Sequence, residues 1–370
     1  MKQVLYAIAL LLSLNLNAQS ETSEIKTTIE NYINGTSYNQ MELINKAFHD
    51  STNLYLDTKT KGLRIIPIAT YKSWFKNGTP GKFNGRIGKI ISIDQFENIA
   101  FAKAEILMTR TNLQFIDMFL LKKLDGEWKI ISKSAGSKTT NKQGNRILFI
   151  VSNAHFYGET QLRNGNSFAE IVNAYDTFIK AGYTIDFVSP KGGAIPLAYI
   201  NTSSQLEKQY LYNNDFMSAL KNTKSPDKLD AKNYKAVHYI GGGSAMFDVP
   251  VNPEIQNLVM EVYEQHNGII SSVCHGTAGI VHLKTKDGKY LVEGKRINGY
   301  PDDYERQNSN QFKTFPFLIR KTIEAHGGTF KYSPRNTPHV EVQGNIVTGQ
   351  NYLSSKPVAQ KIIEMLKRTD

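Results

Sequence analysis

The chain has 370 residues, of which 40% are hydrophobic and 21% charged, and it contains one cysteine, Cys274. This length is enough for two domains, and a single cysteine excludes an intramolecular disulfide, so packed apolar cores must stabilise both. The formal net charge of +11 comes from basic residues scattered along the chain. Because the sequence has no long basic block and no interleaved aromatic and basic pattern, the charge predicts a soluble basic surface and argues against nucleic-acid binding.

The first residues predict export. Met1–Ala18 has a positive start at Lys2, an apolar stretch over 4–16 and an Asn17-Ala18-Gln19 junction, which together are typical of a secretory signal peptide cleaved near Ala18. No later stretch reaches the roughly 20 apolar residues that span a bilayer, and no cysteine near the junction offers a lipid anchor. We therefore expect a secreted or periplasmic protein with no membrane anchor after cleavage.

The segment over 21–137 predicts an α+β domain. A helical pattern precedes a series of strand-like runs, and helices followed by antiparallel-looking strands are typical of that class. The polar, small-residue stretch over 138–144 predicts a linker. The expected helix covers 24–33, and the expected strands cover 53–56, 88–93, 99–108, 114–121 and 128–132.

The segment over 145–370 predicts an α/β doubly wound, flavodoxin-like domain with a mainly parallel sheet. Its apolar strands each precede a helix candidate, which is the order of such a sheet. Asn252 followed by Pro253 suits a helix start, as does Ser354 or Ser355 before Pro357. The expected strands cover 146–151, 184–188, 236–240 and 269–273.

Cys274 is the first candidate for chemistry. It directly follows the strand at 269–273 and precedes His275, Gly276 and a helical pattern over 276–282, which is the order of a nucleophile elbow. A helix N-terminus and a neighbouring imidazole both stabilise a thiolate. The sequence therefore predicts a cysteine nucleophile; the alternative is a buried structural cysteine.

A glycine run gives a candidate oxyanion site. Gly241, Gly242 and Gly243 directly follow the strand at 236–240, so flexible backbone lies at the carboxyl edge of the expected sheet, where free N–H groups can hold an oxyanion. A plain turn is the alternative interpretation. The histidines other than His275 show no spaced metal-ligand pattern, and we expect no metal site.

These motifs in combination resemble the PfpI / DJ-one superfamily, and within it the glyoxalase III / Hsp-thirty-one-like branch. The residues that carry the resemblance are Gly241–Pro250, Ser272–Gly276, Thr348–Asn351, Ser354 and Pro357. The resemblance spans about 145–367 and implies the class I glutamine amidotransferase-like fold.

The resemblance also implies a set of catalytic residues. Cys274 and His275 match the nucleophile and its neighbour, and Glu170 matches an acidic residue early on the first helix. Ser167-x-x-Glu170 also fits a capping box, in which the glutamate only caps the helix. A second acidic residue matches Glu305 best, with Asp302 and Asp303 as alternatives.

The implied activity is the glutathione-independent conversion of a 2-oxoaldehyde to a 2-hydroxy acid, or a deglycase reaction, with no cofactor. Backbone around Gly242, Gly243 and Gly276 would bind the substrate oxyanion. Two alternatives remain open, namely an amidase or peptidase of the same superfamily and a redox-sensing or chaperone-like stress protein that uses oxidation of Cys274.

Residues 21–137 resemble the nuclear-transport-factor-two-like superfamily in its SnoaL / lumazine-binding-like subgroup. The resemblance rests on 32–36, 46–49, 115–123 and 125–131. It implies a curved sheet packed by helices around a cone-shaped cavity. His49 and Asp117 interrupt apolar surroundings and are candidate cavity residues, and we expect this domain to bind a ligand or to form a homodimer.

Overall fold

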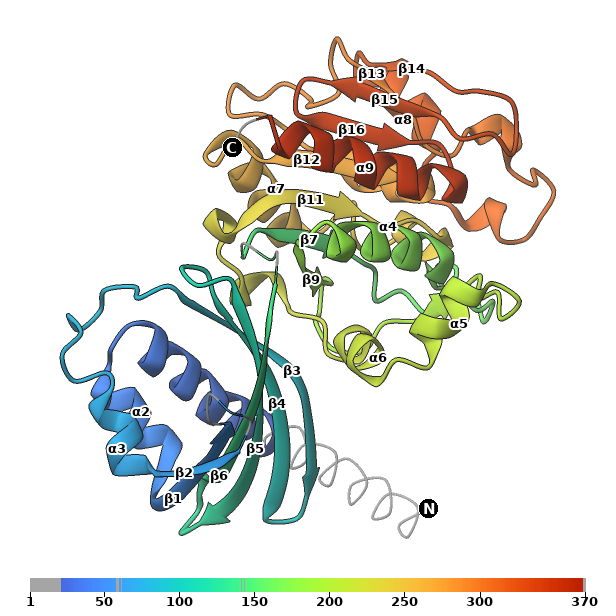
Figure 1. Cartoon of the computed structure of the whole chain (residues 1–370). Helices are drawn as coiled ribbons and strands as arrows, with labels where there is room; N and C mark the ends of the chain where they lie inside the picture. Colours follow the sequence, from blue (N-terminus) through green and yellow to red (C-terminus); the bar gives the residue numbers. More distant parts are fainter. Residues whose placement is uncertain (1–20, 58–59, 61, 141, 143, 369–370) are drawn as a thin grey trace, which may run out of the picture. The chain divides into compact units, whose positions relative to one another are not determined.

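The computed structural model describes residues 21–57, 60, 62–140, 142 and 144–368 (Figure 1). The expected signal peptide, 1–18, lies outside the described residues. The chain divides into two compact units, Met1–Gly144 and Asn145–Asp370. Within the described residues, no helix is long and apolar enough to cross a membrane.

The first unit packs helices against one face of a curved, mainly antiparallel sheet (Figure 1). Described residues 21–37 are helical and are followed by α2 (Met41–Ala47) and α3 (Ile68–Ser73). The strand order is β2-β1-β6-β5-β4-β3, in which β1 and β6 are parallel and the other neighbours antiparallel. The strands are β1 (Phe48–Asp57), β2 (Leu63–Pro67), β3 (Arg86–Phe96), β4 (Ile99–Met108), β5 (Leu113–Leu124) and β6 (Glu127–Thr139).

The alternation of residues along β5 explains which face of this sheet the helices cover. Asp117, Phe119 and Leu121 are buried, whereas Met118 and Leu120 are exposed, as the period of two in a half-buried strand requires. The expected α+β class is confirmed. The expected linker over 138–144 starts too early, because β6 continues to Thr139 through its pairing with β5.

The second unit is built on a six-stranded sheet of described strands in the order β15-β16-β12-β11-β7-β9. Every neighbouring pair is parallel except β15 and β16, so the expected doubly wound, mainly parallel sheet is confirmed. The strands are β7 (Arg146–Ile150), β9 (Thr184–Val188), β11 (Tyr234–Tyr239), β12 (Ile269–Val273), β15 (Val340–Gln343) and β16 (Ile346–Gly349). Two short parallel pairs flank it, β8 (Asn166–Ser167) with β10 (Leu197–Ala198) and β13 (Arg296–Ile297) with β14 (Thr329–Phe330).

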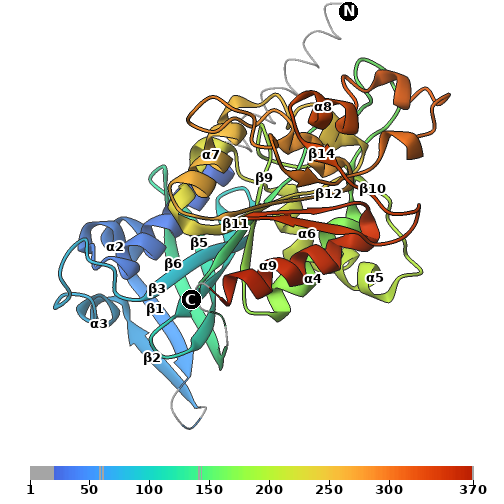
Figure 2. The same cartoon turned by 90° about the horizontal axis from the view of Figure 1, so that it is seen from above.

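Helices cover both faces of this sheet, and Figure 2 shows α4 and α9 on one side and α7 on the other. Strand β7 serves both cores: Leu148 and Ile150 pack with the α7 side, whereas Ile147 and Phe149 pack with the α4 and α9 side. Burial on both faces explains why the strands read as continuous apolar runs. The helices are α4 (Phe168–Lys180), α5 (Gln205–Leu211), α6 (Asn214–Lys221), α7 (Pro253–Glu264), α8 (Ile319–Ala325) and α9 (Ser355–Leu366).

The segment after Cys274 is not the α-helix that the sequence pattern predicted. It is a 3₁₀ helix, η4 (Cys274–Ile280), and nearly all of its residues are buried. Small residues such as Gly276 and Gly279 allow this tight turn to pack against Tyr239 of β11. The remaining 3₁₀ turns are η1 (Pro226–Lys228), η2 (Ala231–Asn233), η3 (Gly243–Met246), η5 (Asp302–Tyr304), η6 (Phe312–Thr314) and η7 (Tyr352–Ser354).

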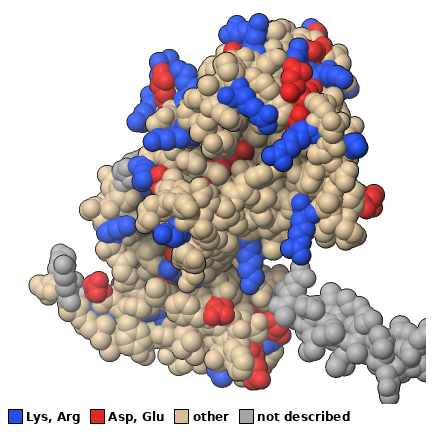
Figure 3. All heavy atoms as spheres, turned by 90° about the vertical axis from the view of Figure 1, so that its right-hand side faces the viewer, with Lys and Arg blue, Asp and Glu red and all other residues tan. Residues whose placement is uncertain are grey.

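Basic and acidic side chains are mixed on one face of the molecule (Figure 3). On the face drawn in Figure 3, Lys and Arg side chains stand singly or in small groups with acidic side chains between them. On this face, the mixed charges do not form the single basic patch that typically binds a polyanion.

The predicted start of α7 can be tested by removing its cap. The Asn252 side chain accepts a hydrogen bond from the Ile255 backbone N–H at 2.8 Å, as the sequence predicted. Asn252→Ala should lower the free energy of unfolding by about 1 kcal/mol, measured by urea denaturation. Asn257→Ala makes the same chemical change at an exposed position inside the same helix, where alanine is the better helix former, and should not lower it. Equal losses in the two variants would contradict a specific cap.

Candidate active site

Cys274 lies at the carboxyl end of β12 in a strained turn. Its φ is +56°, a left-handed conformation that costs a non-glycine residue free energy and is typical of a nucleophile elbow. Its side chain is 8% exposed. Gly241, at the end of the neighbouring strand β11, makes this packing possible, because a Cβ there would lie 2.6 Å from Glu170 Oε2 and 3.0 Å from Cys274 Cβ.

A row of hydrogen-bonded side chains leads away from the thiol. Cys274 Sγ lies 3.5 Å from His275 Nδ1, and His275 Nε2 lies 2.6 Å from Glu305 Oε1. The His275 and Glu305 side chains are 12% and 15% exposed. The imidazole also stacks on Tyr300 with ring centroids 4.8 Å apart, so both neighbours fix its orientation.

The three acidic candidates after the elbow have different surroundings. Glu305 is the one that reaches His275. Asp302 accepts hydrogen bonds from two backbone N–H groups at the start of α8, and Asp303 forms an ion pair with Arg320 at 2.6 Å. The structure therefore brings Glu305 to the imidazole and leaves the two aspartates with structural partners.

Glu170, in the first turn of α4, contacts the thiol from another side. Its side chain is 2% exposed, accepts the Gly241 backbone N–H at 2.8 Å and is hydrogen-bonded to Cys274. Ser167 makes no side-chain hydrogen bond to the helix backbone. The capping-box alternative is therefore wrong, because the Glu170 carboxyl group turns toward the cysteine and β11.

Burial dominates the electrostatics of this pair. It raises the pKa of Glu170 to about 7. Burial, together with the Glu170 charge, also raises the pKa of the Cys274 thiol well above its ordinary value. This direction disfavours a thiolate at rest, because the short, buried η4 does not offset the desolvation of the sulfur.

The three predicted oxyanion glycines all lie where a side chain would clash. A Cβ on Gly242, whose φ is +98°, would lie 2.4 Å from the Gly165 carbonyl, and one on Gly276 would lie 2.5 Å from the Tyr239 carbonyl. A Cβ on Gly243 would lie 2.4 Å from the Tyr157 hydroxyl. These glycines are needed for close packing, and their part in binding an oxyanion stays a prediction.

Sequence reasoning missed three tyrosines around the thiol. Tyr157 and Tyr199 are hydrogen-bonded to each other, and Tyr199 interacts electrostatically with both Cys274 and Glu170. Tyr199 has a φ of +56°, which is unusual for a bulky residue, and the residue is 62% exposed. Strain of this kind gathers at functional sites, but it leaves no sequence signal. Tyr300, whose ring stacks on His275, is the third of these tyrosines.

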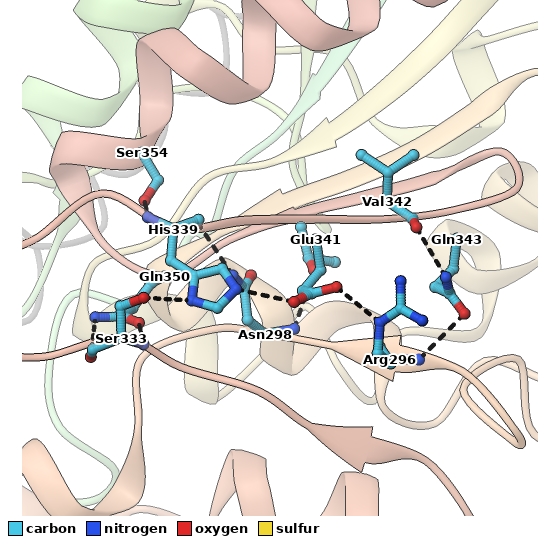
Figure 4. Close-up of polar contacts among 10 residues, drawn as sticks. Arg296, Asn298, Ser333, His339, Glu341, Val342, Gln343, Gln350 and Ser354 are labelled. Carbon is cyan, nitrogen blue, oxygen red and sulfur yellow. Dashed lines mark hydrogen bonds and ion pairs between the residues drawn. The ribbon is translucent and has the colours of Figure 1, made fainter.

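A polar network fixes a further segment beside the site (Figure 4). Ser333 Oγ lies 2.8 Å from His339 Nδ1, and His339 Nε2 lies 2.9 Å from Glu341. This anchors the segment that carries Arg335. The Arg335 guanidinium donates to the Tyr300 hydroxyl at 3.3 Å and forms no ion pair with any described residue. Gln350 completes the network by bonding the Ser333 backbone N–H and carbonyl at 2.7 and 3.1 Å.

The two candidates in the first unit are not brought together. Asp117 is buried and pairs with Lys133 Nζ at 2.9 Å. His49 bonds Ser51 Oγ at 2.7 Å at the partly exposed start of β1. It lines a surface hollow of about 440 Å³ with Leu124, Asp125, Glu127 and Lys129.

The fold and site of the second unit define an α/β protein with a cysteine elbow, a histidine and a carboxylate at the edge of a parallel sheet. Several known proteins are similar to this chain over most of their own length. The chain is 28% identical over 244 residues to Glutathione-independent glyoxalase hsp3102 of Schizosaccharomyces pombe, covering 60% of this chain and 98% of that protein. It is 28% identical over 221 residues to Glyoxalase 3 of Candida albicans, covering 57% and 93%. The crystal structure of glyoxalase III from Candida albicans matches at 25% identity with a TM-score of 0.55, covering 60% of this chain and 98% of that one.

The second unit therefore belongs to the PfpI / DJ-one superfamily, in its glyoxalase III / Hsp-thirty-one-like branch, and the protein is an enzyme of that family. The first unit is a nuclear-transport-factor-two-like domain, since residues 20–134 match a family model described as putative lumazine-binding. Both resemblances found in the sequence are confirmed.

The pKa of Glu170 predicts a pH dependence of stability. The folded protein holds this proton up to about pH 7, whereas the unfolded chain loses it near 4.5. Between these values the folded state binds more protons, so the free energy of unfolding should fall with rising pH, by up to about 3 kcal/mol. Glu170→Gln should flatten this decline in urea denaturation between pH 5 and 8. The exposed control Glu293→Gln should keep the wild-type slope; a wild-type slope in Glu170→Gln would contradict the assignment.

Proposed function

We propose that the protein is an exported, glutathione-independent glyoxalase that converts a 2-oxoaldehyde to a 2-hydroxy acid through Cys274. The observation that carries the proposal is the hydrogen-bonded row of Cys274, His275 and Glu305, with Glu170 buried against the same thiol. It occurs in a unit similar to proteins named glutathione-independent glyoxalases.

The first step is addition of the Cys274 sulfur to the substrate aldehyde. His275, oriented by Glu305, takes the thiol proton as the S–C bond forms, which suits a thiol whose pKa is raised. The aldehyde oxygen gains the charge, and backbone N–H groups near Gly243 and His275 stabilise it. The product of this step is a hemithioacetal.

The second step moves a hydrogen between neighbouring carbons. A base removes the proton from the former aldehyde carbon, an enediol forms, and a proton returns to the former ketone carbon, which leaves a thioester. Glu170, with a pKa of about 7, can both accept and donate a proton near neutral pH. Water then hydrolyses the thioester to the 2-hydroxy acid and restores the thiol, with no net oxidation or reduction.

A purely redox-sensing role has less support. Oxidation of a cysteine proceeds through the exposed thiolate, whereas the Cys274 side chain is 8% exposed and burial raises its pKa. These properties favour a thiol that is deprotonated within the reaction over one that is deprotonated at rest.

The export part of the proposal rests on the sequence of Met1–Ala18 and not on the described structure. A carbonyl-converting enzyme outside the cytosol would have no access to cytosolic thiol cofactors, which is consistent with a cysteine supplied by the protein itself. Mass spectrometry of the secreted or periplasmic fraction should find a mature N-terminus near Gln19; retention of Met1 in a cytosolic fraction would refute export.

The activity is tested with purified protein and methylglyoxal in the absence of glutathione. Lactate should form, and Cys274→Ala should reduce kcat to the level of buffer alone, because no other group can form the thioester. Turnover that persists in Cys274→Ala, or no turnover of any 2-oxoaldehyde, would refute the glyoxalase assignment. Acyl-enzyme formation from an amide or peptide would instead support the amidase alternative.

The role of Glu305 is tested against a neighbour in the same turn. Glu305→Gln removes the charge that orients and stabilises protonated His275, and kcat should fall about 10²-fold or more. Asp303→Asn makes the same change in a side chain paired with Arg320, and kcat should stay within about twofold of wild type. Equal losses in the two variants would mean that the segment matters only for structure.

A further inference from the structure

The first unit contains a buried polar network on the side of its sheet that the helices cover. The Tyr32 hydroxyl, from the first described helix, donates to Asp117 on β5, and Lys133 on β6 pairs with the other oxygen of Asp117 at 2.9 Å. Arg86 on β3 donates to the Tyr32 hydroxyl at 3.1 Å. Side chains from one helix and three strands therefore meet at one place.

The charges of this network do not balance. Arg86 and Lys133 are two cations, and Asp117 is the one described carboxylate that contacts the network. Burial and the Asp117 charge raise the pKa of Tyr32 well above its ordinary value, so its hydroxyl stays neutral. One positive charge is left without a counter-charge, and an uncompensated buried charge is costly.

The unbalanced charge belongs to Arg86. Lys133 and Asp117 form a pair in which both side chains are almost completely buried, at 4% and 2% exposure. The Arg86 guanidinium has no carboxylate partner among the described residues, and its buried Nε–H has no hydrogen-bond acceptor. A guanidinium binds a carboxylate with two parallel hydrogen bonds, for which a free Nε–H is one of the donors.

The surroundings of Arg86 suit an organic anion. The guanidinium lies 5.8 Å from the Phe75 ring centroid, and the Lys133 ammonium lies 5.8 Å from the Tyr71 ring centroid. Arg86 as a whole residue is only partly buried, whereas its Nε is fully buried. The same core contains three small residues in alternate positions of β4, namely Ala100, Ala102 and Ala104.

We propose that the first unit binds a small organic carboxylate, with the carboxylate group on the guanidinium of Arg86 and an apolar or aromatic body against the neighbouring aromatic rings. The ligand supplies the missing negative charge and the missing acceptor for Nε–H. This site is independent of Cys274 and of the glyoxalase proposal, since all of its residues belong to the other unit.

The proposal is tested by calorimetric titration of the full chain with acetate, hexanoate and benzoate, and with the neutral analogues hexanamide and benzamide. Hexanoate or benzoate should bind, and the amides should not. Arg86→Gln should raise the Kd at least tenfold. Arg86→Lys should give an intermediate Kd, because lysine keeps the charge but cannot donate two parallel hydrogen bonds to one carboxylate. The exposed control Arg64→Gln should bind as wild type.

Two further measurements establish which unit holds the site and which kind of anion it prefers. Cys274→Ala protein should bind the carboxylate with unchanged Kd, and loss of binding in that variant would place the site in the enzyme unit and overturn the proposal. Inorganic phosphate should not displace benzoate. Binding of no carboxylate, equal binding in wild type and Arg86→Gln, or preference for phosphate over every organic carboxylate would each overturn it.

Discussion

The hydrogen bond from the Gly241 backbone N–H to Glu170 is the contact on which the enzyme site depends. It joins the end of β11 to the first turn of α4 at 2.8 Å, and the elbow cysteine packs directly beside both. Neither partner can change without the other: a side chain on Gly241 would displace the carboxyl group, and a shorter side chain at 170 would leave a buried N–H without an acceptor. Three segments far apart in sequence are thereby fixed within contact of one sulfur atom.

The same packing affects the ionisation of the thiol and of the carboxyl group beside it. A carboxyl group and a thiol removed from water both prefer to be neutral, so burial favours the protonated form of each. The imidazole of His275, which is hydrogen-bonded to Glu305, lies within hydrogen-bond distance of the same thiol. The environment of the thiol is thus set by the side chains packed around it and not by the cysteine alone.

The sequence predicted the parts of the site that depend on local pattern. A buried strand directly followed by Cys-His-Gly identified the elbow, and Asn252-Pro253 identified a helix start, because in both cases neighbours in sequence make the contacts. Local pattern failed where a choice depended on distant partners. It could not separate Glu305 from Asp302, since Glu305 is distinguished by its contact with His275 and Asp302 by its hydrogen bonds from the start of α8.

Other residues of the site could not be predicted, because no sequence pattern marks them. Tyr199 and Arg335 lie in irregular segments, and their places are set by the short β10 and by the network around His339. The raised pKa of Cys274 was also beyond the sequence, because desolvation depends on how all of the surrounding elements pack. In the first unit, Asp117 could be singled out from its apolar neighbours. The other charged residues of its network, Arg86 on β3 and Lys133 on β6, could not.

The backbone of Cys274 has a consequence for the evolution of the enzyme. A residue held at a φ of +56° costs the folded protein about 1 to 3 kcal/mol relative to one that adopts this conformation freely. Glycine would relieve that cost at once, and it would also delete the nucleophile. Mutational drift toward a more stable fold therefore runs against activity at this position, and selection for catalysis must act continuously to keep the less stable residue there.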